Sequence, residues 1–181
     1  GLEPLADILL AQNITSGTSE DLAIPFVDAE KGVESVKDAI AGAEDIIAER
    51  VSDDAELRKK LRRIYLKNGE IVTKLTKTED DAAKTYEMYA DYSENVAEIK
   101  PHRILAINRG ESEGYLKVKV LIDDAFAVRV CEAFFVKNES VTTSNVRNAV
   151  ADAYKRLIQP SIEREVRGLL TENAQEQAIK M

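Results

Sequence analysis

Pro101–Gly114 reads PHRILAINRGESEG, and a second string at Pro160–Arg167 reads PSIEREVR. In the first string a proline opens a short amphipathic segment, and Gly110 follows it. Proline is tolerated in the first turn of a helix, and glycine accepts the left-handed conformation in which many helices end. We therefore predict a helix over Pro101–Arg109 that ends at Gly110, and a second helix that starts or kinks at Pro160.

Apolar residues spaced three and four apart predict that most of the remaining chain is helical. The other expected helices with two defined ends are Pro4–Gln12, Ala125–Val136, Ser144–Ile158, Ser161–Leu170 and Thr171–Met181. Three more are expected: one starts at Val33, one follows Ser52 and ends at Asn68-Gly69, and one starts at Thr78 and has an inner face that reaches Val96. The alternating string YLKVKVLI predicts a strand at Tyr115–Ile122, and Ile71–Leu75 is a candidate partner strand. The expected fold is mainly α, a bundle of roughly eight to ten helices with one or two short strands.

Two helices and a following extended segment give the outline of a helix-turn-helix-like module with a wing at residues 27–76. The flanking segments, 1–26 and 77–181, would form one discontinuous helical body. The last expected helix reaches Met181 without a closing glycine or proline, and the strand at Tyr115–Ile122 needs partners for its edges. We interpret the chain as a segment of a larger protein, truncated at its C-terminus.

The composition is typical of a soluble, helix-rich protein, with 44% hydrophobic and 32% charged residues. No apolar run is long enough for a membrane helix, and no signal-peptide pattern opens the chain. Cys131 is the only cysteine and His102 the only histidine, which excludes an internal disulfide and argues against a zinc site. We expect a cytoplasmic protein without metal, cofactor or membrane contact.

The charge of the chain is unevenly distributed. The net charge is −8, yet the stretch Glu56–Leu75 holds seven cations and two anions, a sum of +5 that leaves −13 for the rest. This stretch is the best candidate for a surface that faces a polyanion. Four of its cations share one broad helical face, opposite the apolar positions, and are the candidate nucleic-acid-binding residues Arg58, Lys59, Arg62 and Arg63.

This basic helix carries no residue placed to read adenine, so any binding would be to the phosphate backbone and would be weak and non-specific. The alternative is a solvated helix face, or one that docks on an acidic domain. Arg103 and Arg109 are further candidates, either for phosphate or for carboxylates that join neighbouring helices.

No pattern of residues supports catalysis. His102 has no nucleophile or second acid–base partner at a diagnostic spacing. The acidic pairs Asp53-Asp54, Asp80-Asp81 and Asp123-Asp124 stand where helices begin or a strand turns, positions that favour negative charge without a metal ion. We therefore expect a non-enzyme; a nuclease fragment is the weaker alternative.

The two opening strings, together with DIIAER at Asp45–Arg50, resemble the Tex family of bacterial transcription accessory proteins over nearly all 181 residues. The resemblance implies the family's N-terminal helical region with its helix-turn-helix-like element. The family also has a ribonuclease-H-like domain, helix-hairpin-helix units and an S1 nucleic-acid-binding domain; no ribonuclease-H-like or S1 segment is recognisable in this sequence.

By this resemblance the chain would be a nucleic-acid-associated scaffold that positions the absent domains. Its partners would be nucleic acid, DNA or RNA, and RNA polymerase or other transcription machinery. The alternative function is a protein–protein interaction scaffold without nucleic-acid contact.

Overall fold

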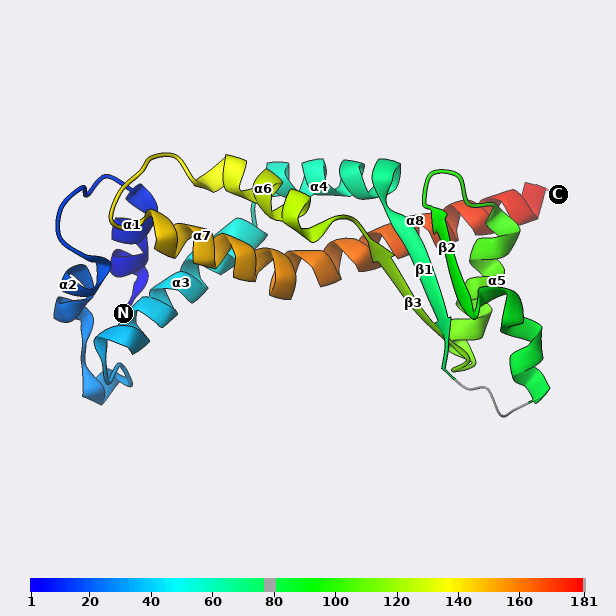
Figure 1. Ribbon diagram of the computed structural model, residues 1–181, viewed down its shortest axis with the longest axis horizontal. Coiled ribbons are helices and arrows are strands. Elements are labelled where there is room, and N and C mark those ends of the chain that lie inside the picture. Colours follow the sequence, from blue (N-terminus) through cyan, green and yellow to red (C-terminus); the bar gives the residue numbers. More distant parts are fainter. Residues whose placement is uncertain (77–80, 181) are drawn as a thin grey trace. The chain divides into compact units, whose positions relative to one another are not determined.

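The computed structural model describes residues 1–76 and 81–180. The chain divides into two compact units, the first made of Gly1–Arg58 with Asp124–Gln159 and the second of Lys59–Asp123 with Pro160–Met181. Both contain helices, and the second also holds a small antiparallel sheet (Figure 1). The predicted class, mainly α with a few strands, is confirmed. No helix within the described ranges has both the length and the apolar content to cross a bilayer.

The first unit is built from helices alone. Its elements are α1 (Glu3–Ala11), α2 (Ser19–Ala23), η1 (Ile24–Phe26), η2 (Ala29–Lys31), α3 (Val36–Ser52), the first turn of α4 (Ala55–Asn68), α6 (Asp124–Phe135), α7 (Thr143–Asp152) and η4 (Ala153–Ile158). Helix α3 packs against α1 and α7 (Figure 1). The core between them consists of small and branched side chains, among them Leu5, Leu9, Ala43, Ile47, Val146 and Val150.

Helix α3 begins three residues later than the predicted start at Val33. Ser35 is its cap, because the Ser35 hydroxyl accepts a hydrogen bond from the backbone N–H of Asp38 at 3.1 Å. Val33 instead pairs with Asp28 in a tight turn. The buried face of α3 includes Ala39, Ala43, Ile47 and Val51.

The second unit places helices beside a three-stranded antiparallel sheet. Its elements are most of α4, β1 (Glu70–Leu75), η3 (Asp81–Tyr89), β2 (Asp91–Asn95), α5 (Pro101–Ser112), β3 (Leu116–Leu121) and α8 (Gln159–Lys180). The strand order is β2-β1-β3, so β1 is central and pairs with both neighbours. The predicted strands at Ile71–Leu75 and Tyr115–Ile122 are confirmed and pair with each other.

The two faces of this sheet differ in chemistry because side chains alternate along each strand. One face is buried and carries Ile71, Thr73, Leu116, Val118 and Val120. The other is open to solvent and carries Glu70, Val72 and Lys74 on β1, Lys117, Lys119 and Leu121 on β3, and Asp91, Ser93 and Asn95 on β2.

The long helix predicted from Thr78 to Val96 is wrong. The described part, Asp81–Tyr89, is a 3-10 helix, and Asp91–Asn95 is strand β2; Thr78–Asp80 lie outside the described residues. The Thr73 hydroxyl, on the central strand, donates to the Tyr89 carbonyl at 2.7 Å and fixes the end of the 3-10 helix. The next residues form hydrogen bonds with the free edge of β1. The stability gained from this strand pairing outweighs the helical preference that the spacing of apolar residues indicates.

The predicted end of the helix that starts at Pro101 is also wrong. Gly110 does not end α5, which runs to Ser112; a Cβ at Gly110 would lie 2.5 Å from Leu116 Cδ1, so this glycine allows close approach of the helix to β3. Gly114, with φ +84°, makes the left-handed turn into β3.

Helix α8 is one element where two helices, Ser161–Leu170 and Thr171–Met181, were predicted. The Thr171 hydroxyl donates to the Arg167 carbonyl one turn before it, the arrangement of a residue inside a helix and not of a cap. Before α8, η4 is a π-helix in which Gln159 N–H bonds the Tyr154 carbonyl. Pro160 has no N–H for the usual partner, the Arg156 carbonyl, which favours this local change of pattern.

Candidate nucleic-acid interface

The basic helix α4 is fixed by a cap and by one buried stripe. Asp54 Oδ1 accepts a hydrogen bond from the backbone N–H of Leu57 at 2.8 Å, so Asp54 and not Ser52 is the cap. Leu57, Leu61 and Tyr65, spaced four apart, are fully buried. Since this stripe occupies one side of the helix, the lysines and arginines between its members lie toward solvent.

Arg58 is engaged inside the first unit. Its guanidinium Nε donates to the Ser52 carbonyl, and Nη2 donates to Ser52 Oγ at 3.0 Å. Ser52 is the last residue of α3, where carbonyls lack helical donors and a positive charge is favourable. Arg58 thus stabilises the α3–α4 corner.

The three other candidates on α4 belong to the second unit and differ in what they contact. Arg62 Nε lies 2.7 Å from Glu165 Oε2 on α8, and both side chains are about one-third exposed, 34% and 37%. Lys59 and Arg63 are exposed, and within the described residues no carboxylate pairs with either. Among the four candidate residues on α4, these two are the ones whose charge remains available to a ligand.

The two candidate arginines of α5 also differ. Arg103 Nη1 donates to the Tyr92 hydroxyl at 3.1 Å, and the guanidinium carbon lies 5.7 Å from the centre of the Tyr92 ring. Burial raises the pKa of Tyr92, and its hydrogen bond to Glu94 adds to the effect. Arg109 is exposed on the same helix. The structure therefore gives Arg103 a packing role beside β2 and leaves Arg109 accessible.

The strings quoted from the sequence meet each other in the second unit. Arg167 of α8 forms a two-pronged ion pair with Glu111 of α5, at 2.8 and 3.2 Å, and also donates to Asn108 Oδ1 at 2.8 Å. Asn108 Nδ2 donates in turn to the Thr171 hydroxyl at 2.9 Å. The polar residues of the two strings thus join α5 to α8. Their role is structural, and they do not form a ligand site.

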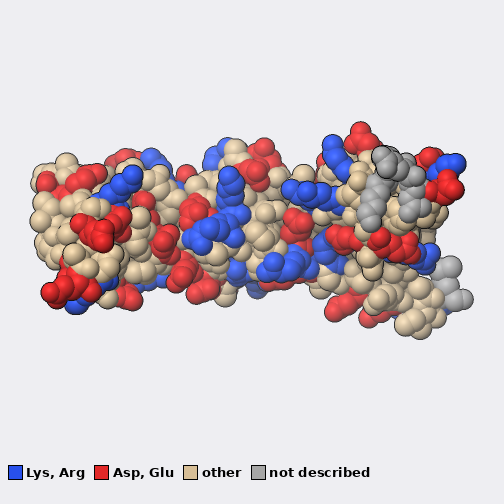
Figure 2. Space-filling view, turned by 90° about the horizontal axis from the view of Figure 1, so that it is seen from below, with Lys and Arg blue, Asp and Glu red and all other residues tan. Residues whose placement is uncertain are grey.

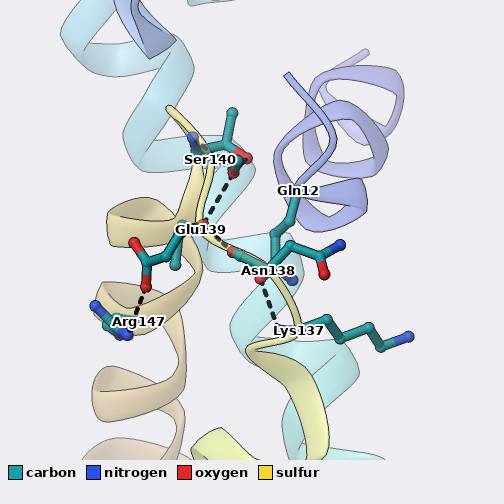
Figure 3. A network of polar contacts seen from close by, with 8 residues as sticks. Gln12, Lys137, Asn138, Glu139, Ser140 and Arg147 are labelled. Atoms are coloured by element: carbon teal, nitrogen blue, oxygen red, sulfur yellow. Dashed lines mark hydrogen bonds and ion pairs between the residues drawn. The ribbon is translucent and has the colours of Figure 1, made fainter. Parts of the chain in front are cut away.

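A polar network in the first unit was not foreseen from the sequence (Figure 3). Gln12 ends α1 in a left-handed conformation, φ +54°, and is almost wholly buried. Its amide donates to the Phe135 carbonyl at 2.7 Å, and its Oε1 accepts from the backbone N–H of Lys137 at 2.9 Å. These bonds satisfy the end of α6 and the connection to α7. Glutamine at a helix end is an unusual choice, so no local signal pointed to this role.

Glu44 is a second residue that the sequence did not single out. It lies on α3, and within the described part of the chain no donor reaches its buried atom Oε2. Burial raises the pKa of Glu44, while the amides of Asn148 and Asn145 oppose the shift. Glu44 sits beside two further carboxylates, those of Asp45 and Asp152. Glu44 stands between the apolar positions of the helix, where an exposed glutamate is also common. The sequence therefore does not predict that it is partly buried.

Charge is mixed on one face of the molecule. On the face drawn in Figure 2, lysine and arginine side chains alternate with aspartate and glutamate. Such a surface disfavours strong binding to a polyanion and leaves room for local contacts.

The chain matches a family model described as Tex central region-like over residues 15–181. It is 42% identical to protein YdcI of Bacillus subtilis over 99% of this chain and 25% of that protein. It is 33% identical to transcriptional accessory protein Tex of Neisseria gonorrhoeae, over 65% of this chain and 15% of that protein. A human protein, S1 RNA-binding domain-containing protein 1, is 31% identical over 83% of this chain and 16% of its own length. The chain thus spans about a quarter or less of these relatives.

Proposed function

Because the chain belongs to the Tex central region-like family of transcription accessory proteins, we propose that it is a non-catalytic scaffold segment that contacts nucleic acid weakly and without sequence specificity. The scaffold role rests on its rigid helices, which position the domains that the longer relatives contain. The contact with nucleic acid would be electrostatic.

One observation carries the nucleic-acid proposal. Helix α4 buries Leu57, Leu61 and Tyr65, yet it leaves Lys59 and Arg63 exposed and unpaired within the described residues. Two unneutralised cations one turn apart suit phosphate oxygens. Arg58 stabilises the α3–α4 corner, and Arg62 forms the ion pair with α8. Both therefore contribute by holding α4 in the position from which Lys59 and Arg63 would contact phosphate.

Several finer assignments are part of the same proposal. Residues 27–76, which include α3, α4 and β1, would act as the helix-turn-helix-like module. The names of two relatives, one for RNA binding and one for transcription, support RNA and the transcription machinery as partners. DNA as an alternative nucleic acid and a cytoplasmic location belong to the same proposal. Arg109 would add a phosphate contact from α5.

The test is a salt titration of binding with a paired variant, Lys59→Gln with Arg63→Gln. Affinity for a labelled single-stranded RNA and a labelled duplex DNA is measured by fluorescence anisotropy. We expect the slope of log affinity against log salt to fall by about 1.5, because each phosphate contact contributes roughly 0.7–0.9 to it. Affinity at low salt should fall with it.

The matched control is Lys37→Gln with Arg129→Gln, one exposed lysine and one exposed arginine elsewhere in the chain. It changes the net charge equally and should leave most of the slope intact. Equal slopes for the two variants would remove α4 as the contact. A wild-type chain that binds neither nucleic acid would favour the protein-interaction scaffold instead.

A further inference from the structure

The open face of the sheet in the second unit concentrates three lysines. Lys74 on β1 lies directly opposite Lys117 on β3, and Lys119 is two residues further along β3, opposite Val72. All three side chains are exposed. Together with Val72 and Leu121 they line a groove of about 300 Å³.

This arrangement is unfavourable for the isolated chain. Like charges directly opposite each other on neighbouring strands destabilise a sheet. Within the described ranges, no carboxylate forms an ion pair with any of the three lysines. The carboxylates on the same face are Asp91, across from Lys74 on β2, and Glu70 at the far end of β1. An anion between the lysines would relieve the repulsion.

Protection of a sheet edge explains only part of the pattern. Lysines on an edge strand discourage unwanted pairing with other chains, and β3 is an edge strand. Lys74, however, is on β1, which has a strand on each side and needs no such protection. Asp91 faces Lys74 from β2 and offsets part of its charge, but this carboxylate does not lie between Lys74 and Lys117, so their repulsion calls for another explanation.

We propose that the open sheet face, defined by Val72, Lys74, Lys117, Lys119 and Leu121, binds the phosphate backbone of a nucleic-acid strand. Lys117 and Lys119 are about 7 Å apart along their strand, and Lys74 is about 5 Å across from Lys117. The first spacing suits successive phosphates along an extended nucleic-acid strand. Alternate carboxylates of an extended acidic peptide repeat at the same distance, so the choice of nucleic acid rests on the proposed function.

The chemistry of the groove also sets the kind of recognition. Lysine ammonium groups act as point charges that do not read base edges. None of the five side chains is aromatic, so bases have no ring to stack on. Val72 and Leu121 supply apolar surface for the sugars. Binding at this face is therefore independent of the nucleotide sequence. The ligand class is the same as in the proposed function, but the residues that bind it are different.

The experiment compares two triple variants of this chain with equal changes in net charge. The test variant carries Lys74→Gln, Lys117→Gln and Lys119→Gln; the control carries Lys37→Gln, Lys100→Gln and Lys155→Gln, three exposed lysines elsewhere. Circular dichroism checks that both are folded. Binding of a labelled oligouridylate is followed by anisotropy over a salt series.

We expect the test variant to lose about tenfold or more in affinity at low salt and about 2 in the log–log salt slope, because three phosphate contacts are removed. The control should lose much less. In nuclear magnetic resonance spectra of the wild type, added oligouridylate should shift the backbone amides of β1 and β3.

Four outcomes would overturn the inference. Equal losses in both triple variants, or amide shifts absent from β1 and β3, would do so and leave the proposed function standing if the α4 variant still loses affinity. Binding of polyglutamate that matches oligouridylate in strength and in sensitivity to the test variant would assign the face to acidic protein. A wild type that binds no nucleic acid would reject this ligand together with the proposed function.

Discussion

At the scale of single residues, Glu44 is a carboxylate in an unfavourable environment. Its Oε2 atom is buried without a donor among the described residues, close to Asp45 and Asp152. Asn145, one of its two amide neighbours, also accepts a hydrogen bond from Ser19 at 2.5 Å. The folded unit therefore holds the Glu44 proton more tightly than the unfolded chain does.

The sign of the resulting pH dependence follows from the raised pKa. As the pH rises from about the ordinary value of 4.5 toward the pKa in the folded state, the unfolded chain ionises first, so stability falls over that window. We expect Glu44→Gln to remove this loss and to stabilise the chain at neutral pH by about 1 kcal/mol or less, because the carboxyl is only half-buried.

Urea unfolding of wild type and Glu44→Gln at both ends of this pH window measures the effect. Glu49→Gln, at an exposed position on the same helix, removes the same charge and is the control. A Glu44→Gln variant that is less stable than wild type at neutral pH would mean that the carboxylate accepts hydrogen bonds worth more than its burial costs.

At the scale of elements, the contact between α5 and α8 depends on the planar fork of Arg167. The side chain is 17% exposed and reaches both oxygens of Glu111 as well as Asn108. A lysine has one point charge and cannot reproduce this geometry. We expect Arg167→Lys and Arg167→Ala to lose similar stability, about 1–2 kcal/mol.

A double-mutant cycle with Glu111→Ala, read from urea midpoints, isolates the pair. Arg164→Ala, at an exposed position on α8, serves as the control and should cost little. Full retention of stability in Arg167→Lys would show that charge alone, and not the fork, joins the two helices.

Elements whose signal is local were predictable, and those decided by distant partners were not. The stripe of α4 and the alternation of β3 lie within a few residues, so their type could be read directly from the sequence. Strand β2 exists because β1 has an open side, and its sequence DYSEN carries no period-two apolar pattern. The end of α5 was misplaced because Gly110 serves packing against β3 and not a turn.

The candidate site shows the same division. That Lys59 and Arg63 are exposed follows from the helical pattern of α4. That Arg58 bonds Ser52 and Arg62 bonds Glu165 depends on neighbours that only the folded chain supplies. The lysine face needed the register of β1 against β3, which pairs Lys74 with Lys117 across 43 positions of sequence.

At the scale of the whole molecule, each of the two units has its own buried core, so we expect them to differ in their response to a local change. Gly110→Ala is a suitable perturbation of the second unit. The added methyl would lie 2.5 Å from Leu116 Cδ1 and 3.0 Å from Tyr86 Cδ1, both in buried side chains. Overpacking costs about 1–3 kcal/mol, which outweighs the gain of about 1 kcal/mol from helix propensity.

Amide hydrogen exchange reads this prediction element by element. In Gly110→Ala we expect faster exchange in α5, β1 and β3, while α3 and α7 keep their wild-type rates. Gly168→Ala is the matched control: a Cβ there meets no atom within 4 Å, so this variant gains helix propensity without a clash and should slow exchange in α8. If Gly110→Ala instead accelerated α3 and α7 by the same factor as α5, the two cores would unfold as one cooperative unit, and the division of the chain would describe packing without independent stability.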